Sequence, residues 1–157
     1  MARLASLPRP DVAGLRWTAQ EQWHVTLRFL GNVDDAAPVG AAVAEVASRT
    51  PSVEATVGPV TGRFGQRILH LPVNGLAPLA GQVVAATAGF GQPPEDRSFA
   101  GHVTLARVRE RARVDLRPLA GAPLAGEWLV DELTVVESRL SAAGARYEVV
   151  ARAPLAP

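Results

Sequence analysis

The tetrapeptide His-Val-Thr-Leu occurs twice in this 157-residue chain, at residues 24–27 and again at residues 102–105. β-branched and aromatic residues surround both copies, and such segments favour β-strands. Side chains two positions apart on a strand point to the same face. Each copy is therefore predicted to bury its valine and leucine on one face and to present histidine beside threonine on the other. We interpret the two copies as two halves of one site.

The composition limits the kinds of chemistry that the chain can perform. Cysteine is absent from the sequence, which excludes disulfides, thiol catalysis and thiolate metal sites. All 16 basic residues are arginine, so every side-chain cation that can bind phosphate is a planar guanidinium, and no lysine can form a Schiff base. The net charge of +1 confines any nucleic-acid contact to a local patch of the surface.

Length and hydropathy predict one globular domain that covers residues 1–157. No apolar run is long enough to span a bilayer, and the chain does not begin with basic residues followed by an apolar stretch. We therefore expect a cytoplasmic protein that does not contact a membrane, and we expect it to be a monomer.

Local patterns predict the order strand, helix, strand, strand, helix, strand, strand, strand. The first helix is expected at residues 34–49, with Asp34 or Asp35 as N-cap, and the second at residues 75–90. Two helices and two histidine strands half a chain apart suggest a duplicated α+β unit with mainly antiparallel sheets. The six strands of this order are predicted at residues 23–30, 53–60, 67–73, 102–108, 128–140 and 146–152, and a brief strand at 15–17 precedes them. A helix end is expected in residues 1–11, a helical turn at 18–21, a hairpin loop at 61–66 and a turn at 141–145.

Two facing histidines suit acid–base chemistry because the unperturbed pKa of histidine, about 6.5, lies near neutral pH. A neutral imidazole would take a proton from an attacking water, and a protonated one would give a proton to the leaving ribose oxygen of a cyclic phosphodiester. The threonine hydroxyls would donate hydrogen bonds to the non-bridging oxygens, which become more negative in the transition state. This pattern predicts phosphoryl chemistry without a metal or another cofactor.

Other interpretations of these residues remain open. A single His-x-Thr on a strand is usually structural, whereas two copies in one short chain favour function. His70 is predicted to be a packed or edge-strand histidine, and Pro72 suggests that its strand lies at an edge or near its end. A zinc site formed by His24, His70 and His102 is an alternative, although no carboxylates stand at ligand spacing. The arginine-rich residues 107–117 are either a solvated surface or a contact for a nucleic-acid backbone.

The residues around both copies resemble the double H-x-T (HxTx) signature of the 2H phosphoesterase superfamily, and within it the RNA 2′,3′-cyclic phosphodiesterases, also called 2′-5′ RNA ligases. Leu15-Arg16-Trp17-Thr18 and residues 22–31 look like the first motif block of that family. Residues 97–107, which contain the second copy and end in Arg107, look like the second block. The resemblance runs from about Leu15 to the C-terminus.

The resemblance implies a bilobal, pseudo-twofold α+β fold with antiparallel sheets around a central cleft. It implies an enzyme that opens a terminal 2′,3′-cyclic phosphate of RNA to a 2′-phosphate, without a cofactor. By analogy, His24 is the general acid and His102 is the general base. Thr26 and Thr104 hold the phosphate, and Arg107 matches the arginine that closes the second motif.

Three departures from the family pattern generate further expectations. Family members begin with a strand and a helix before the Arg-Trp segment, so we expect this first strand and helix to be missing. Gly101 stands where the family has proline, which makes the entry to His102 less rigid. Strand parity puts Arg107 on the face opposite His102 unless a bulge intervenes, so Arg28, which shares the parity of His24, is the alternative phosphate ligand.

Three alternatives to an RNA cyclic phosphodiesterase follow from the sequence. The substrate could be another small cyclic nucleotide phosphate. The chain could instead be a truncated, inactive module that binds RNA ends. In a purely structural β-protein, the two imidazoles would lie far apart.

Overall fold

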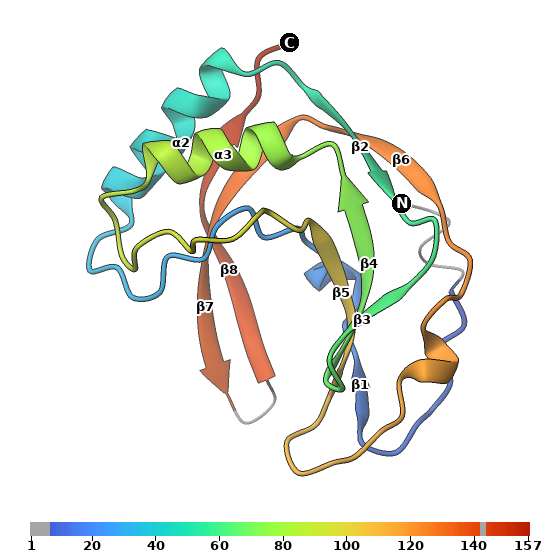
Figure 1. Cartoon of the computed structure of the whole chain (residues 1–157). Helices are drawn as coiled ribbons and strands as arrows, with labels where there is room; N and C mark the ends of the chain where they lie inside the picture. Colours follow the sequence, from blue (N-terminus) through green and yellow to red (C-terminus); the bar gives the residue numbers. More distant parts are fainter. Residues whose placement is uncertain (1–6, 142–143) are drawn as a thin grey trace. The chain divides into compact units, whose positions relative to one another are not determined.

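The computed structural model describes residues 7–141 and 144–157 of the chain (Figure 1). Part of the helix end predicted in residues 1–11, and part of the turn predicted at 141–145, lie outside the described residues. Contacts divide the chain into two compact units. The first unit contains the chain up to Thr26, Ala55–Gly75 and Ala100–Trp128, and the second contains Leu27–Glu54, Leu76–Phe99 and Leu129–Pro157.

The first unit is built on a sheet in which β5 and β4 are interior strands. The strand order is β1-β5-β4-β2-β6, with β3 also paired to β4, and the pairs β1–β5, β5–β4, β4–β2 and β4–β3 are antiparallel. The strands are β1 (Leu15–Trp17), β2 (Val53–Val57), β3 (Gly62–Phe64), β4 (Ile68–Asn74), β5 (His102–Val108) and β6 (Gly126–Val130), with 3-10 turns η1 (Gln20–Gln22) and η2 (Arg117–Leu119).

One face of β4 and β5 forms the core of this unit. Leu69 and Leu71 alternate along β4 and are 1% and 0% exposed, and Val103 and Leu105 of β5 are also buried. Burial of such side chains contributes about 1.5–3 kcal/mol each, which makes this face the main source of stability for the sheet. The opposite face of the same strands is left to carry polar side chains, including the second histidine motif.

The second unit joins two helices to a hairpin of long strands. Helix α2 (Ala37–Arg49) packs against β7 (Glu132–Ser141), β8 (Gly144–Pro154) and α3 (Ala77–Ala86). The N-cap of α2 is Ala36 rather than the predicted Asp34 or Asp35. Asp35 stands one residue earlier, where its carboxylate accepts a hydrogen bond from the backbone N–H of Ala37 at 2.9 Å. The buried stripe of α2 recurs at helical spacing and consists of Val39, Val43, Val46 and Ala47. None of the described helices is long and apolar enough to cross a membrane.

The predicted α+β class with antiparallel sheets is confirmed, as are both helices and the order of most strands. Residues 62–64 form β3 rather than a hairpin loop, and the run predicted at 128–140 divides at Asp131 into β6 and β7. Pro72 lies near the end of β4, as predicted, but β4 is an interior strand rather than an edge.

The strand predicted at residues 23–30 is wrong. Within this described segment, only Val25 makes a ladder contact, an isolated antiparallel bridge to Val103. Beyond it, the Leu30 carbonyl accepts a hydrogen bond from the Gln92 N–H at 2.7 Å, so the segment binds the loop after α3 instead of a neighbouring strand. The composition of residues 23–30 favours a strand, but beyond Val25 the backbone of this segment is hydrogen-bonded to a loop.

Candidate functional site

The Val25–Val103 bridge brings the two tetrapeptides together. In an antiparallel pair, the residues that flank a bridge face each other in reverse order, so His24 lies opposite Thr104 and Thr26 lies opposite His102. The two histidines are then diagonal neighbours, with backbones about 7–8 Å apart. Val103 is buried between two partly exposed side chains, so all four polar groups share the other face. The predicted grouping of His24, Thr26, His102 and Thr104 therefore follows from the register.

Both imidazoles are held in the same way by the backbone. The Nδ1 atom of His24 lies 2.7 Å from the carbonyl oxygen of Gln22, and the Nδ1 atom of His102 lies 2.9 Å from that of Ala100. A carbonyl can only accept, so Nδ1 carries the hydrogen in each neutral ring and Nε2 keeps its lone pair. Each histidine thus offers Nε2 to a substrate, as a base when neutral and as an acid when protonated.

A β-bulge moves Arg107 to the face of the site. The register of β4 against β5 shifts between Leu69 and His70, because Leu69 pairs with Ala106 whereas His70 pairs with Thr104. The extra residue, Leu105, restores the parity, so that Arg107 pairs with Ile68 on the face that carries His70 and Thr104. The bulge that Arg107 requires to reach the site is therefore present.

Arg16 is a neighbouring cation that the sequence analysis did not single out. It pairs directly with Arg107 across β1 and β5, and both side chains are exposed. Two guanidiniums side by side on the sheet suit a bound anion such as a phosphate. The only signal in the sequence was the brief predicted strand at 15–17, whose register could not be read.

His70 is packed, as predicted, but it is also part of the site. It is 8% exposed and pairs with Thr104 on β5 and with Gly62 on β3. Its ring stacks on Phe64 with centroids 3.9 Å apart and lies 5.6 Å, edge to face, from the ring of His102. The sequence signal was its alternation with Leu69 and Leu71, which gives it the opposite face from the core.

Burial, and secondarily the charge of His102, lower the pKa of His70. The unfolded chain therefore binds a proton at His70 more readily than the folded chain does, and the stability decreases as the pH falls below about 6.5. We expect His70→Phe, which cannot be protonated, to lose less stability than the wild type between pH 7.5 and pH 5. Urea unfolding at both pH values measures this, and an equal loss in the two proteins would contradict it. His24 and His102 are present in both proteins, so the comparison isolates the effect of His70.

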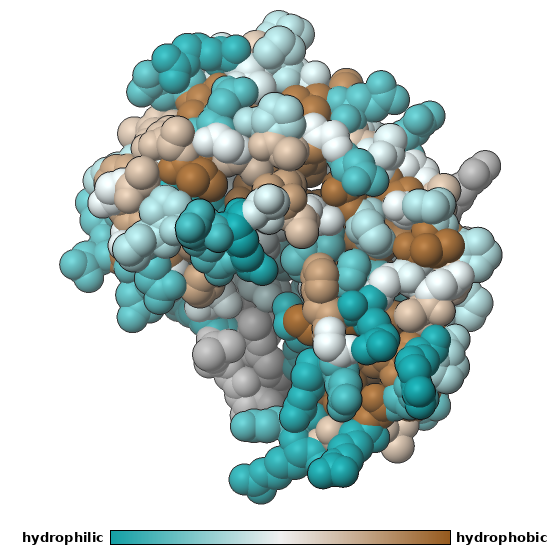
Figure 2. Space-filling view, in the orientation of Figure 1, coloured by the Kyte–Doolittle hydropathy of each residue, from teal (hydrophilic) through white to brown (hydrophobic). Residues whose placement is uncertain are grey.

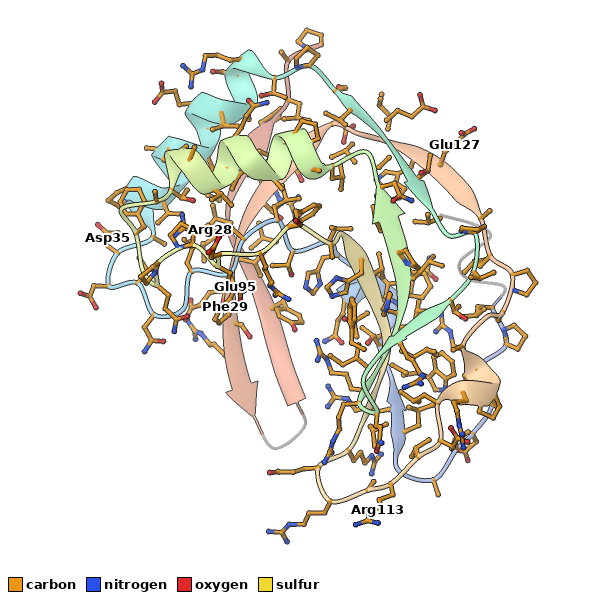
Figure 3. All side chains as sticks on the ribbon, in the orientation of Figure 1. Arg28, Phe29, Asp35, Glu95, Arg113 and Glu127 are labelled. Atoms are coloured by element: carbon orange, nitrogen blue, oxygen red, sulfur yellow. The ribbon has the colours of Figure 1, made fainter. Side chains whose placement is uncertain are left out.

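Arg28 is bound to the end of α3, in the second unit. Its Nη1 atom donates to the carbonyl of Val84 at 3.1 Å and to the Thr87 hydroxyl at 2.8 Å, and Nη2 donates to the carbonyls of Phe90 and Gln92 at 3.1 and 2.9 Å. Figure 3 shows Arg28 against the loop that follows the helix. The Nη1 and Nη2 atoms, which a phosphate would contact, already donate to these four acceptors. This argues against Arg28 as the phosphate ligand. Partial burial also lowers its pKa.

The arginine-rich segment after β5 lies at the surface, which both a solvated face and a contact for a nucleic-acid backbone require. Arg109, Arg111 and Arg113 are exposed, and Figures 2 and 3 show hydrophilic side chains, Arg113 among them, where the chain turns after β5. Arg117 binds Asp115 through its Nη2 atom at 2.9 Å, and these hydrogen bonds lower the pKa of Asp115. Among the residues that the structure describes, no three His, Asp or Glu side chains are grouped to hold a metal ion, so the alternative zinc site is not formed.

Comparison with known proteins agrees with this arrangement. A family described as the 2′-5′ RNA ligase superfamily matches residues 9–141. The crystal structure of TT0787 of Thermus thermophilus has a TM-score of 0.75 and 25% identity, covering 91% of this chain and 83% of that one. No match was found among curated proteins.

Two further structures share the fold and more than a quarter of the aligned sequence. The structure of E. coli LigT complexed with 3′-AMP has a TM-score of 0.68 and 27% identity, covering 98% of this chain and 87% of that one. A crystal structure described as a phosphoesterase has a TM-score of 0.65 and 27% identity, covering 92% and 83%. The family match spans both histidine motifs and most of the chain, and this chain belongs to the 2′-5′ RNA ligase superfamily of 2H phosphoesterases.

Proposed function

We propose that this phosphoesterase opens the terminal 2′,3′-cyclic phosphate of RNA to a 2′-phosphate, with His24 and His102 as the acid and the base. The observation that carries the proposal is the Val25–Val103 bridge, which sets the two His-x-Thr pairs side by side on one surface. Separate histidines can each be structural, but two imidazoles that are diagonal neighbours on one surface suit in-line displacement at phosphorus.

In the proposed reaction, the neutral Nε2 of His102 takes a proton from water as the water oxygen bonds to phosphorus. The bond from phosphorus to the ribose 3′ oxygen breaks, and Nε2–H of His24 gives its proton to that oxygen. The carbonyls of Gln22 and Ala100 accept from Nδ1–H, which fixes each ring and stabilises it while it is charged. The products are a 3′ hydroxyl and a 2′-phosphate, and the two imidazoles exchange protonation states.

The threonines and Arg107 are proposed to hold the phosphate. Each threonine lies opposite a histidine across the bridge, so its hydroxyl can donate to a non-bridging oxygen. Arg107 stands two pairs along the sheet from Thr104, on the same face because of the bulge, and offers a bidentate guanidinium.

Ligands in related structures support a nucleotide phosphate as the substrate. Crystal structures of E. coli LigT, at 24–27% identity to this chain, are described as complexes with 3′-AMP, NADP+, ATP or phosphate. All four ligands carry phosphate, and three of them carry an adenine nucleotide, so RNA or a small nucleotide is the chemical class that we expect this chain to bind.

The test is turnover of a short RNA that ends in a 2′,3′-cyclic phosphate, in EDTA, with the 2′- and 3′-phosphate products resolved. A cyclic mononucleotide and an RNA with a 3′ hydroxyl serve as comparison substrates. Metal-independent formation of the 2′-phosphate supports the proposal. Turnover of the mononucleotide alone would favour a phosphodiesterase for another cyclic nucleotide, and RNA binding without turnover would favour an inactive end-binding module.

Replacing the hydroxyl of Thr104 tests the phosphate contact. We expect Thr104→Val to reduce kcat/KM by up to about tenfold, because a neutral hydrogen-bond donor contributes about 0.5–1.5 kcal/mol. Thr134→Val is the matched control, since Thr134 is an exposed strand residue on β7 in the second unit. Steady-state kinetics on the cyclic-phosphate RNA would contradict the contact if both variants behaved like the wild type.

A further inference from the structure

The second catalytic histidine lies against a pair of stacked aromatic rings. Both histidines follow the same sequence pattern, both bind a carbonyl two residues before them, and the bridge relates them by a local twofold arrangement. The backbone therefore holds the two rings alike. His102 in addition contacts the stacked rings of Phe64, on β3, and His70, on β4.

The three ring separations define the geometry of this contact. The Phe64 and His70 centroids are 3.9 Å apart with nearly parallel planes, and the His102 centroid is 4.8 Å from Phe64 and 5.6 Å from His70. If His102 lay over the outer face of one stacked ring, its centroid would be much farther from the centroid of the other stacked ring. His102 therefore lies beside the stack, with its ring plane at 81° to that of Phe64 and at 67° to that of His70.

His70 is the tightly packed member of the stack, whereas Phe64 is 40% exposed. His70 is 8% exposed, and Gly62 leaves room for its ring, because a Cβ atom at Gly62 would come within 2.8 Å of His70 Cε1. The Nδ1 atom of His70 is buried and has no hydrogen-bond partner among the described residues. A buried imidazole without a hydrogen bond at Nδ1 contributes through its shape, since that nitrogen adds a desolvation cost and no contact.

We propose that Phe64 and His70 are positioning residues that form a wall beside the ring of His102 and hold that ring in the orientation required of the general base. The proposal rests on the proposed function and adds to it the groups that position the base. The hydrogen bond from Nδ1 to the Ala100 carbonyl holds one edge of the His102 ring. The contact with the wall then restricts rotation of the ring about that hydrogen bond. Loss of the wall would leave the hydrogen bond as a single hinge about which the ring can swing.

Three substitutions at and around His70 test this role. We expect His70→Ala to reduce kcat by about 10- to 10²-fold with little change in KM, because small displacements of a catalytic group cost rate rather than binding. His70→Phe keeps the shape of the wall and should retain most of kcat. Gly62→Ala leaves His70 in place but pushes its ring, and should reduce kcat in a protein that keeps all three histidines.

A second measurement does not depend on turnover. Reaction of each histidine with diethyl pyrocarbonate, mapped by mass spectrometry, reports on the freedom and accessibility of its ring. We expect His70→Ala to raise the modification rate of His102 and to leave that of His24 unchanged, and we expect His70→Phe to restore the wild-type rate. This pattern without turnover of RNA would refute the proposed function while supporting the wall.

Three results would overturn the proposal. If His70→Phe loses as much kcat as His70→Ala, the His70 nitrogen has a chemical role and the wall is not the explanation. If His70→Ala lowers only the melting temperature, with kcat and the His102 modification rate intact, His70 is merely structural. If the modification rate of His24 rises as much as that of His102, the substitution loosens the whole site and the stack does not position His102.

Discussion

His24→Ala and His102→Ala are each expected to reduce turnover of a cyclic-phosphate RNA by about 10²–10⁴-fold, the usual contribution of a positioned acid or base. Both imidazoles act on one phosphorus, so loss of either one interrupts the same proton exchange. The double variant should be little slower than the single variants, because groups that act as a unit are not additive. Single-turnover kinetics at saturating enzyme separates this effect from any change in binding.

The control for these variants is binding of the same RNA and the thermal unfolding of each protein. His24 is exposed and His102 is partly exposed, so neither substitution opens a cavity in the core, and the melting temperatures should change little. Undiminished turnover in either variant, with the fold intact, would refute the two-histidine mechanism. A bell-shaped pH dependence of kcat/KM, lost in each variant, would add independent support.

Arg28→Ala is expected to lower the free energy of unfolding by about 1.5–3 kcal/mol while kcat and KM remain close to the wild type. The guanidinium donates to one carbonyl and one hydroxyl at the end of α3, where carbonyls lack partners within the helix and the helix dipole favours a cation, and to two carbonyls of the loop that follows. Its removal leaves these acceptors unpaired and frees the segment after Val25 from the loop at residues 87–92. Urea denaturation measures the change.

Arg49→Ala is the matched control for Arg28. Arg49 also stands in the last turn of a helix, but its ion pair with Glu45 at 3.3 Å is exposed on both sides, and such pairs contribute little. We therefore expect Arg49→Ala to be nearly neutral. The reverse outcome for Arg28, a higher KM with unchanged stability, would restore Arg28 as a phosphate ligand.

The histidine motifs were predictable because one physical rule acts locally. Alternation of side chains along an extended chain separates His102 and Thr104 from Val103 and Leu105 whatever the partner strand is. The residues of β5 form the expected strand, and the buried and polar faces are those predicted. The first motif keeps this alternation through one bridge alone, since the rest of its predicted strand is bound to a loop.

The arginines and His70 show where local rules stop. Parity favoured Arg28 over Arg107, and a single bulge reverses that order, because one inserted residue turns every following side chain to the other face. Nothing in residues 102–107 signals the bulge, which exists only in the register of β5 against β4. The same register sets His70 beside Thr104, and Gly62 leaves the space that its ring fills.

The sequence by itself determined the α+β class, the two helices, the two His-x-Thr pairs and the guanidinium-only cations, because each follows from composition or from a period of two or 3.6 residues. Only the tertiary structure decided which arginine faces the histidines, that Arg28 caps α3, and that His70 and Phe64 stand against His102. These facts depend on pairing between segments that are distant in the chain. Contacts between the paired strands determine the register and the bulge, and a local sequence pattern does not identify the partner strand.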